Sequence, residues 1–472
     1  MFRKLIGTRA FYRHVLLLAV PIMIQNGITN FVNMLDNVMV GSLGTHEMTG
    51  VAVSNQLMFV FNLCIFGAVS GAGIFGAQFF GKKDVKGVRD TFRFKILFCT
   101  LLAVGGIVLL LTAGDALVSL YLQGEGSAQS VTASLSFALD YVRIMLIGLV
   151  PYTHVQCYAS TLRETGKTLL PMVAGLVAVL VNLCLNAILI YGYLGAPALG
   201  VKGAAIATVI SRFVELLIIA LWTHLKSKEN TFIVGAYRSL RVPMKLVRSI
   251  AWRGFPLMLN ETLWSAGIAT INQCYSMRGL DVVAAININQ TFFNVFSVAF
   301  MAVGVSIGII VGQQLGAGDM EGAKDSSRKL IAFSVFISTV FATAYAIFAI
   351  VIPQVYNVEP SVRTLATALM QISALTMPID AFAHGSYFTL RSGGKTIITF
   401  LFDSCFAWCV TASAAFLLVH LTSLPIIPLY AICTGLNFFK CVVGFVLVKR
   451  GVWLQNIVQG SQPDAVTEQG AT

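Results

Sequence analysis

The sequence predicts an all-α integral membrane protein with twelve transmembrane helices arranged in two six-helix bundles. The chain has 472 residues, of which 57% are hydrophobic and only 11% are charged, whereas an ordinary soluble domain carries roughly 25% charged residues. Its mean hydropathy is +0.81, so a water-soluble fold could not bury its apolar surface. The apolar residues form twelve runs, each near the roughly 20 residues with which a helix spans a bilayer. A water-soluble enzyme is therefore excluded.

The twelve runs follow one another with short polar breaks. We expect spans at 15–40, 50–78, 95–118, 133–160, 169–193, 200–223, 250–276, 283–312, 330–353, 362–389, 397–421 and 425–448. The domain organisation that follows is an N-lobe of residues 1–225, an inter-lobe linker of residues 226–249 and a C-lobe of residues 250–450. The polar segment 451–472 is rich in Gln, Gly and Ser, which predicts a disordered tail.

Basic residues fall almost entirely on one side of these spans. One set of alternate loops, together with both termini, holds 26 of the 32 Lys and Arg residues, and the other set holds three. Because loops rich in Lys and Arg stay in the cytoplasm, both termini are predicted to be cytoplasmic in a multi-pass protein of the plasma (inner) membrane. The charge is spread over many short loops, which argues against a nucleic acid partner. We expect membrane lipids around a functional monomer.

The two halves of the chain repeat. At an offset of 235 residues, GKKDVKGVRDTFR at 81–93 matches GAGDMEGAKDSSR at 316–328, and at an offset of 228, LRETGKT at 162–168 matches LRSGGKT at 390–396. Both halves begin on the same side, so the repeat is parallel, about an axis along the membrane normal. We expect the substrate path at the interface between the halves. Both segments contain GKT, as phosphate-binding loops do, but such a loop also needs a glycine five residues before the glycine of GKT. Those positions hold Thr161 and Thr389, so neither GKT indicates a nucleotide site.

These features together resemble the multidrug and toxic compound extrusion (MATE) family. The resemblance rests on the two G-x-x-D-x-x-G loops, the two L-R-x-x-G-K-T segments, VPIMIQNGITNFVNMLDNVMVGSLG at 20–44, NLCLNAILIYG at 182–192 and GVKGAAIAT at 200–208. It implies a V-shaped, two-lobed fold with a central cavity. It also implies a secondary antiporter, not an enzyme, that exports small amphipathic and often cationic organic compounds in exchange for Na⁺ or H⁺, with no other cofactor.

Four polar residues are expected to meet in the outer half of the N-lobe. A carboxylate within a span is costly and suggests a function, and Asp36 lies far along the first span. Asn182 and Asn186 of the fifth span and Thr208 of the sixth reach a similar depth by the helical rise. Their oxygens could bind Na⁺, or Asp36 could accept a proton. The resemblance implies that all four match the family's N-lobe ion site, with Asn186 where many members carry a second aspartate. Alternatively, the two asparagines only join neighbouring helices.

Two further carboxylates are expected to meet in the C-lobe. Glu261 and Asp380 both lie roughly 16 Å from the cytoplasmic end at a helical rise of about 1.5 Å per residue. Two apposed carboxylates would share one proton. The resemblance implies that Asp380 matches an aspartate of the C-lobe cation site in one branch of the family, whereas Glu261 is offset by one helical turn from that branch's glutamate. The alternative is that both acids form only structural hydrogen bonds.

The remaining charges within the spans are read as helix-surface pairs. Asp140 with Arg143, and Arg212 with Glu215, are spaced to neutralise each other within one helix. Asp403 has no basic residue within its own span and receives no role. The nine cysteines are an odd number, all within apolar runs, and indicate neither a disulfide framework nor a metal site beyond possible Na⁺ at the four N-lobe residues.

Two equivalent prolines are candidates for helix hinges. Pro21 and Pro256 can kink the first and seventh spans, because proline lacks an N–H and crowds the preceding turn. A static bend is an equal alternative.

The alternative function is a flippase of lipid-linked or other amphiphilic substrates on a related fold. A membrane-embedded prenyl transferase is disfavoured, since the sequence has no aspartate cluster that could hold Mg²⁺-diphosphate.

Overall fold

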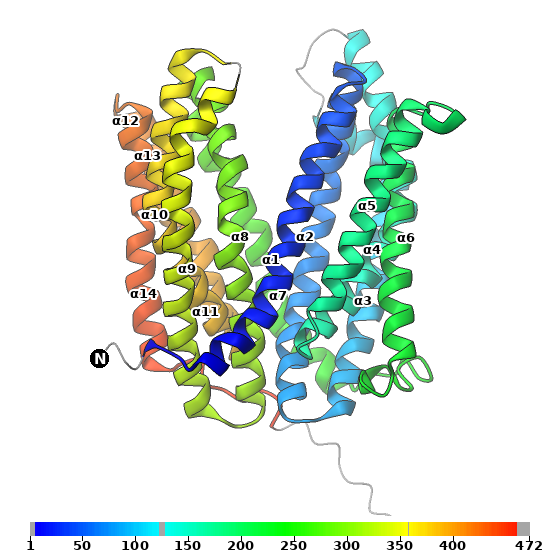
Figure 1. Ribbon diagram of the computed structural model, residues 1–472, viewed down its shortest axis with the longest axis vertical. Coiled ribbons are helices and arrows are strands. Elements are labelled where there is room, and N and C mark those ends of the chain that lie inside the picture. Colours follow the sequence, from blue (N-terminus) through cyan, green and yellow to red (C-terminus); the bar gives the residue numbers. More distant parts are fainter. Residues whose placement is uncertain (1–4, 122–127, 357, 460–472) are drawn as a thin grey trace, which may run out of the picture.

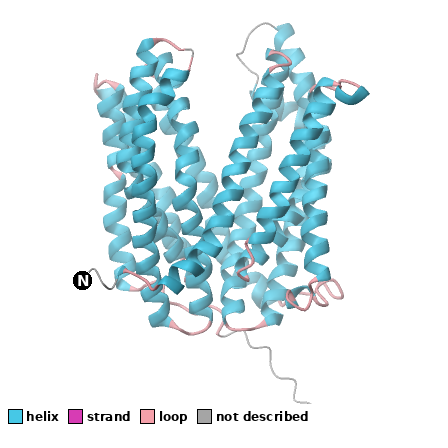
Figure 2. Ribbon diagram, in the orientation of Figure 1, coloured by secondary structure: helices cyan, strands magenta, loops and turns pink. Residues whose placement is uncertain are grey.

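The computed structural model describes residues 5–121, 128–356 and 358–459, and this part of the chain folds into helices without a β-strand. The helices stand side by side in two groups (Figure 1), joined by short loops (Figure 2). The all-helical, two-lobed architecture that the sequence predicts is confirmed.

Each half of the chain contributes one group of helices. The N-terminal half forms α1 Arg9–Gly41, α2 Thr45–Gly81, α3 Val85–Tyr121, α4 Ala128–Glu164, α5 Leu169–Tyr191 and α6 Val201–Leu225. The C-terminal half begins with α7 Met244–Ser276, α8 Leu280–Gly316, α9 Met320–Val355 and α10 Pro360–Ser392. A helical rod follows, with π-helical turns at Leu401–Cys405 and Ala407–Ala412 between α11 Thr396–Phe400 and α12 Ser413–Leu421. The last span is formed by α13 Ile426–Gly435 and α14 Asn437–Arg450.

These segments occupy the twelve predicted spans. In the described part of the chain, eleven helical segments are long and apolar enough to cross a bilayer. The twelfth is α7, which has 33 residues but carries Arg253, Asn260 and Glu261 along its length. It begins at Met244, before the predicted start at residue 250. Both candidate hinges, Pro21 and Pro256, lie inside continuous helices.

The two lobes converge at the face where the N-terminus and the α2–α3 and α8–α9 loops lie, here called the terminal face, and diverge at the opposite face (Figure 1). Repeated glycines permit the convergence. A Cβ atom on Gly81 would lie 1.8 Å from the carbonyl oxygen of Gln313, and one on Gly316 would lie 1.9 Å from that of Gln78. Any side chain at either glycine would therefore push α2 and α8 apart.

The first helix packs against both lobes. Val15, Leu18 and Ile22 belong to a buried apolar cluster made largely of C-lobe residues, whereas Asp36 near the other end bonds to a residue of α5. Pro21 lies at the end of the part that contacts the C-lobe. A bend there changes the angle between the two parts of α1.

The chain after α14 is ordered through residue 459, which corrects the prediction of a disordered tail from residue 451. Trp453 and Val458 are both 0% exposed. Trp453 packs in a C-lobe cluster and Val458 in an N-lobe cluster. Because two apolar side chains have found buried sites in different lobes, residues 451–458 form a strap across the terminal face. Residues 460–472 of the predicted tail lie outside the described residues.

Candidate functional site

The four predicted N-lobe residues form one chain of hydrogen bonds. Asn186 donates from Nδ2 to Oδ1 of Asp36 at 2.7 Å and to Oδ1 of Asn182 at 3.2 Å. Asn182 in turn donates to the hydroxyl of Thr208 at 3.2 Å. Both asparagines are buried. Their spacing of four residues on α5 presents the two amides on one face, toward α1 and α6.

This network has an oxygen free for a cation. Oδ1 of Asn186 is buried and has no hydrogen-bond partner among the described residues, and it belongs to the same amide that bonds Asp36. A carboxylate with an adjacent unpartnered amide oxygen offers the hard oxygen ligands that Na⁺ takes. The carboxylate can instead hold a proton. The residues present therefore fit either coupling ion.

In the C-lobe, Glu261 and Asp380, which are expected to meet, bond to different partners, and no hydrogen bond joins the two acids within the described part of the chain. Glu261 accepts a hydrogen bond from the hydroxyl of Tyr387 at 3.2 Å, whereas Asp380 accepts one from Asn437 on α14 at 2.9 Å. Tyr387 lies seven residues after Asp380 on α10, or roughly 10 Å farther along at the helical rise. The depth estimate assumed straight helices starting at the predicted boundaries, whereas α7 starts earlier and contains Pro256.

A polar cluster that the sequence left unassigned lies beside Glu261. Asp403 forms an ion pair with Lys440 of α14 and accepts a hydrogen bond from Asn260 at 3.2 Å. The amide oxygen of Asn260 accepts from the Ser404 hydroxyl at 2.8 Å. The sequence contained a signal for this ion pair: Asp403 in the eleventh span and Lys440 in the twelfth each lack an oppositely charged residue in their own span. Opposite charges buried in adjacent spans favour pairing.

One of the two expected pairs within a helix forms and the other does not. Arg212 and Glu215 are 3.0 Å apart, as predicted. Asp140 pairs with Lys202 of α6 at 3.2 Å rather than with Arg143, which is exposed. A partner on a neighbouring helix replaced the one within the helix.

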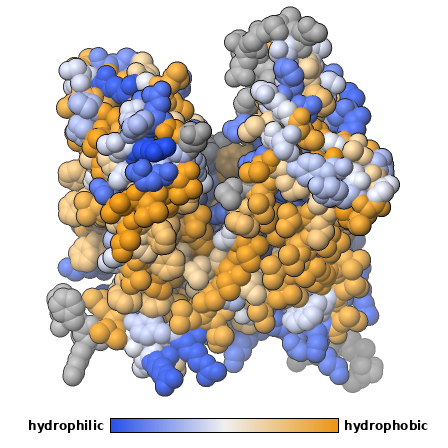
Figure 3. Space-filling view, turned by 45° about the horizontal axis from the view of Figure 1, so that its top comes forward, coloured by the Kyte–Doolittle hydropathy of each residue, from blue (hydrophilic) through white to orange (hydrophobic). Residues whose placement is uncertain are grey.

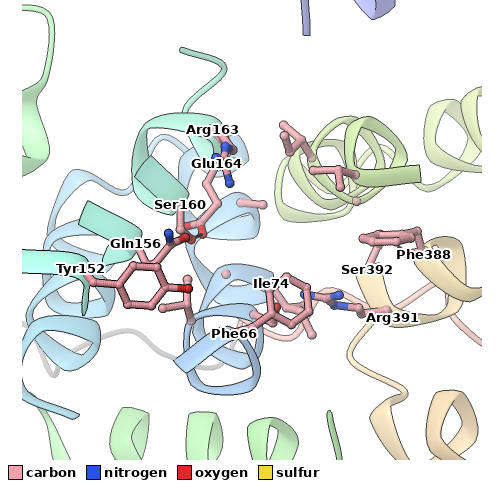
Figure 4. Close-up of a pocket in the computed structure, with 17 residues that line it drawn as sticks. Phe66, Ile74, Tyr152, Gln156, Ser160, Arg163, Glu164, Phe388, Arg391 and Ser392 are labelled. Atoms are coloured by element: carbon pink, nitrogen blue, oxygen red, sulfur yellow. Dashed lines mark hydrogen bonds between the residues drawn. The ribbon is translucent and has the colours of Figure 1, made fainter. Parts of the chain in front are cut away.

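A hollow separates the lobes at the face opposite the terminal face, as the space-filling view shows (Figure 3). Nearer the terminal face, where the lobes meet, lies a cavity of about 170 Å³. Its walls come from α2 and α4 of one half and α8 and α10 of the other, and they include Tyr152, Arg163 and Glu164 opposite Phe388 and Arg391 (Figure 4). The cavity therefore lies between the two halves, where the repeat predicts the substrate path.

The cavity is closed toward the terminal face by contacts that cross between the lobes. Nε2 of Gln78 on α2 donates to the carbonyl of Ser392 at 2.9 Å, and Nε2 of Gln313 on α8 donates to that of Glu164 at 2.7 Å. The strap adds a bond from the Ile457 amide to Oε1 of Gln78 at 2.9 Å. These glutamines occupy equivalent repeat positions, but the sequence alone could not show that each reaches the opposite lobe.

Comparisons with known proteins agree with this architecture. The MatE family model matches residues 21–188 and 256–417, and the two matches begin at the equivalent residues Pro21 and Pro256. A relative named probable multidrug resistance protein NorM, from Thermotoga maritima, is 24% identical, with 94% of each chain covered. The multidrug resistance protein MdtK of Yersinia pseudotuberculosis is 25% identical, with 94% of this chain and 95% of MdtK covered.

Solved structures show the same fold. An outward-facing multidrug resistance MATE family transporter of the MOP superfamily superimposes with a TM-score of 0.85 at 19% identity, covering 96% of this chain and 98% of that one. A MATE crystal structure in the straight conformation gives the same score, identity and coverage. Since the family model matches more than half of the chain, in two repeats that the structure places in two lobes, this protein belongs to the MatE family of multi-pass membrane transporters.

Proposed function

We propose that this protein is a secondary antiporter that exports small amphipathic, often cationic organic compounds from the cytoplasm in exchange for Na⁺ or H⁺. The observation that carries the proposal is the partly buried hydrogen-bond chain from Asp36 through Asn186 and Asn182 to Thr208, in which the Asn186 amide oxygen beside the carboxylate has no partner among the described residues. Relatives named as multidrug resistance proteins support export as the activity. Membership in a family of transporters supports a role other than an enzyme.

The excess of basic residues on the terminal face supports a cytoplasmic location for that face and for both termini. The hollow between the lobes then opens to the outside. In this proposal residues 1–225 and 250–450 are the moving lobes and residues 226–249 link them. Opening to the cytoplasm requires the contacts of Gln78 and Gln313 to break.

The coupling ion acts by differential affinity, because a ligand shifts an equilibrium between two states only as far as it binds one better. Asp36 is on α1 and its partners are on α5 and α6. An ion that joins the carboxylate to Asn186 therefore favours one position of α1 over another. Pro21 lies fifteen residues before Asp36 on α1, near the end of the part that packs on the C-lobe, which supports a hinge there and, by the repeat, at Pro256.

The decisive experiment is efflux from proteoliposomes under an imposed Na⁺ gradient or an imposed proton gradient, each alone. Substrate accumulation driven by one gradient and absent without it supports antiport and identifies the ion. Accumulation that needs neither gradient contradicts it. Orientation is tested with cysteines at Leu280 and Lys228, which lie on opposite faces, in a background without native cysteines: an impermeant thiol reagent added outside should label the first only.

A further inference from the structure

Two arginines from opposite lobes line the cavity where the lobes meet. Arg163 lies in the last turn of α4 and Arg391 in the last turn of α10, and they are equivalent in the L-R-x-x-G-K-T repeat. Both border the same cavity of about 170 Å³. Figure 4 shows Arg163 next to Glu164 on one side of it and Arg391 near Phe388 on the other.

Neither guanidinium has an acidic partner at ion-pairing distance among the described residues. Arg163 donates from Nη2 to Gln25 at 2.9 Å, but its Nε is buried without a partner. Arg391 lies over the ring of Phe388 at 5.1 Å and makes no side-chain hydrogen bond within the described part of the chain. Two guanidinium groups therefore face one cavity, and neither forms an ion pair with Glu164, the acid among its lining residues.

The acid that lines the cavity is already engaged. Glu164 accepts hydrogen bonds from Lys95 at 2.6 and 2.7 Å and from the hydroxyl of Ser160. The side chain of Lys95 is 0% exposed, so this pair neutralises itself within the N-lobe. Since unpaired buried charges are unfavourable and guanidinium groups bind carboxylates through paired N–H donors, the cavity is suited to an incoming anionic group.

We propose that Arg163 and Arg391 bind the carboxylate of an amphipathic substrate in this cavity. This inference rests on the proposed export function and narrows its substrate class to compounds that carry a carboxylate, zwitterions included. Phe66, Ile74 and Tyr152 supply apolar wall for the substrate's rings. Because the arginines belong to opposite lobes, a carboxylate that contacts both is held only when the lobes meet at the terminal face.

A matched pair of dyes tests the proposal: a rhodamine with a free carboxylate and its ethyl ester, which shares the ring system and lacks the anion. Binding is measured by fluorescence anisotropy on the full-length protein in dodecyl maltoside without added phospholipid. We expect Arg391→Gln to weaken binding of the acid by about tenfold or more, the loss of one charge-assisted contact, and to leave the ester's affinity unchanged. Arg391→Lys should restore part of the acid's affinity, and Arg163→Gln should act like Arg391→Gln.

Arg143→Gln is the control, since Arg143 is an exposed arginine of α4 that does not line the cavity. Thermal unfolding of each variant verifies folding, and Arg391→Gln serves if Arg163→Gln fails to fold. Equal weakening for acid and ester, or a wild-type protein that binds the acid no more tightly than the ester, overturns the proposal. Failure of the antiport proposal is seen separately, as the absence of gradient-driven efflux of either dye from proteoliposomes.

Discussion

Gln78 and Gln313 occupy equivalent positions in the two halves, and each donates a hydrogen bond to the last turn of a helix in the opposite lobe. Three residues beyond each glutamine, a glycine packs against the backbone of the other glutamine. The internal repeat thus produces a reciprocal contact that holds the lobes together at the terminal face. Any state that opens toward that face must break both halves of it.

Replacing Gly316 with valine should prevent this closure. The new Cβ would lie 1.9 Å from the carbonyl oxygen of Gln78, so α2 and α8 must separate. We expect longer distances between spin labels at the exposed positions Lys86 and Glu321, measured by pulsed electron resonance. Gly105→Val is the control, because a Cβ at Gly105 meets no atom within 4 Å. Unchanged distances in the Gly316 variant would contradict a closing role for this contact.

Truncation after Gly451 should loosen the same face by removing the strap. Trp453 and Val458 would lose buried sites in different lobes, and Gln78 would lose its bond from Ile457. We expect a larger fraction of the long spin-label distance and a lower unfolding temperature than in the wild-type protein. A truncation after Gln459 keeps the strap and should behave as wild type. Identical behaviour of the two truncations would show that the strap carries no part of the closure.

Asp36→Asn should abolish coupling without unfolding the protein, because the amide has the size of the carboxylate but no charge. We expect gradient-driven efflux in proteoliposomes to fall by about tenfold or more, within the usual range of coupling between sites. Asp140→Asn provides the matched control, since Asp140 pairs with Lys202 outside the network. Wild-type efflux by the Asp36 variant would exclude this carboxylate as the coupling group.

Glu261 and Asp380 should act independently, because they bond to different residues on different helices. In a double-mutant cycle, the effects of Glu261→Gln and Asp380→Asn on unfolding free energy should add within about 0.5 kcal/mol. The contacting pair Glu261→Gln and Tyr387→Phe should deviate from additivity by more than that. The measurement is chemical or thermal unfolding in detergent. Strong coupling of Glu261 with Asp380 would place the two acids together after all.

Lys95→Met should destabilise the N-lobe strongly. The Lys95 ammonium lies 2.6 Å from Glu164 and its side chain is fully buried, so removing it leaves an uncompensated carboxylate. We expect a loss of about 3–5 kcal/mol of unfolding free energy, as for other broken buried pairs. The double variant Lys95→Met, Glu164→Gln should recover a substantial part of that loss. No recovery would mean that Lys95 stabilises through packing rather than charge.

Much of the candidate site can be predicted from the sequence, because the position of a residue along a membrane-spanning helix gives the depth of its side chain in the bilayer. Helices of nearly constant rise cross an apolar layer of nearly constant thickness, so counting residues placed Asp36 level with Asn182, Asn186 and Thr208, and the structure joins them. The same counting predicts that Glu261 lies level with Asp380. The hydrogen-bond partner of Glu261 is Tyr387 on α10 instead, and α7 starts earlier than predicted and contains Pro256.

By itself, the sequence determined the class of the molecule, its twelve helices and its division into two repeated halves, because hydrophobic burial in lipid and backbone hydrogen bonding leave few alternatives. Only the tertiary structure decided which helices are neighbours. The structure pairs Asp403 with Lys440, and it shows that Gln78 and Gln313 each bond to the lobe opposite their own. It also shows that residues 451–458 contact both lobes and that Arg163 and Arg391 line one cavity. Such contacts depend on the rotation and tilt of each helix, which side-chain packing sets and which hydropathy along the chain does not encode.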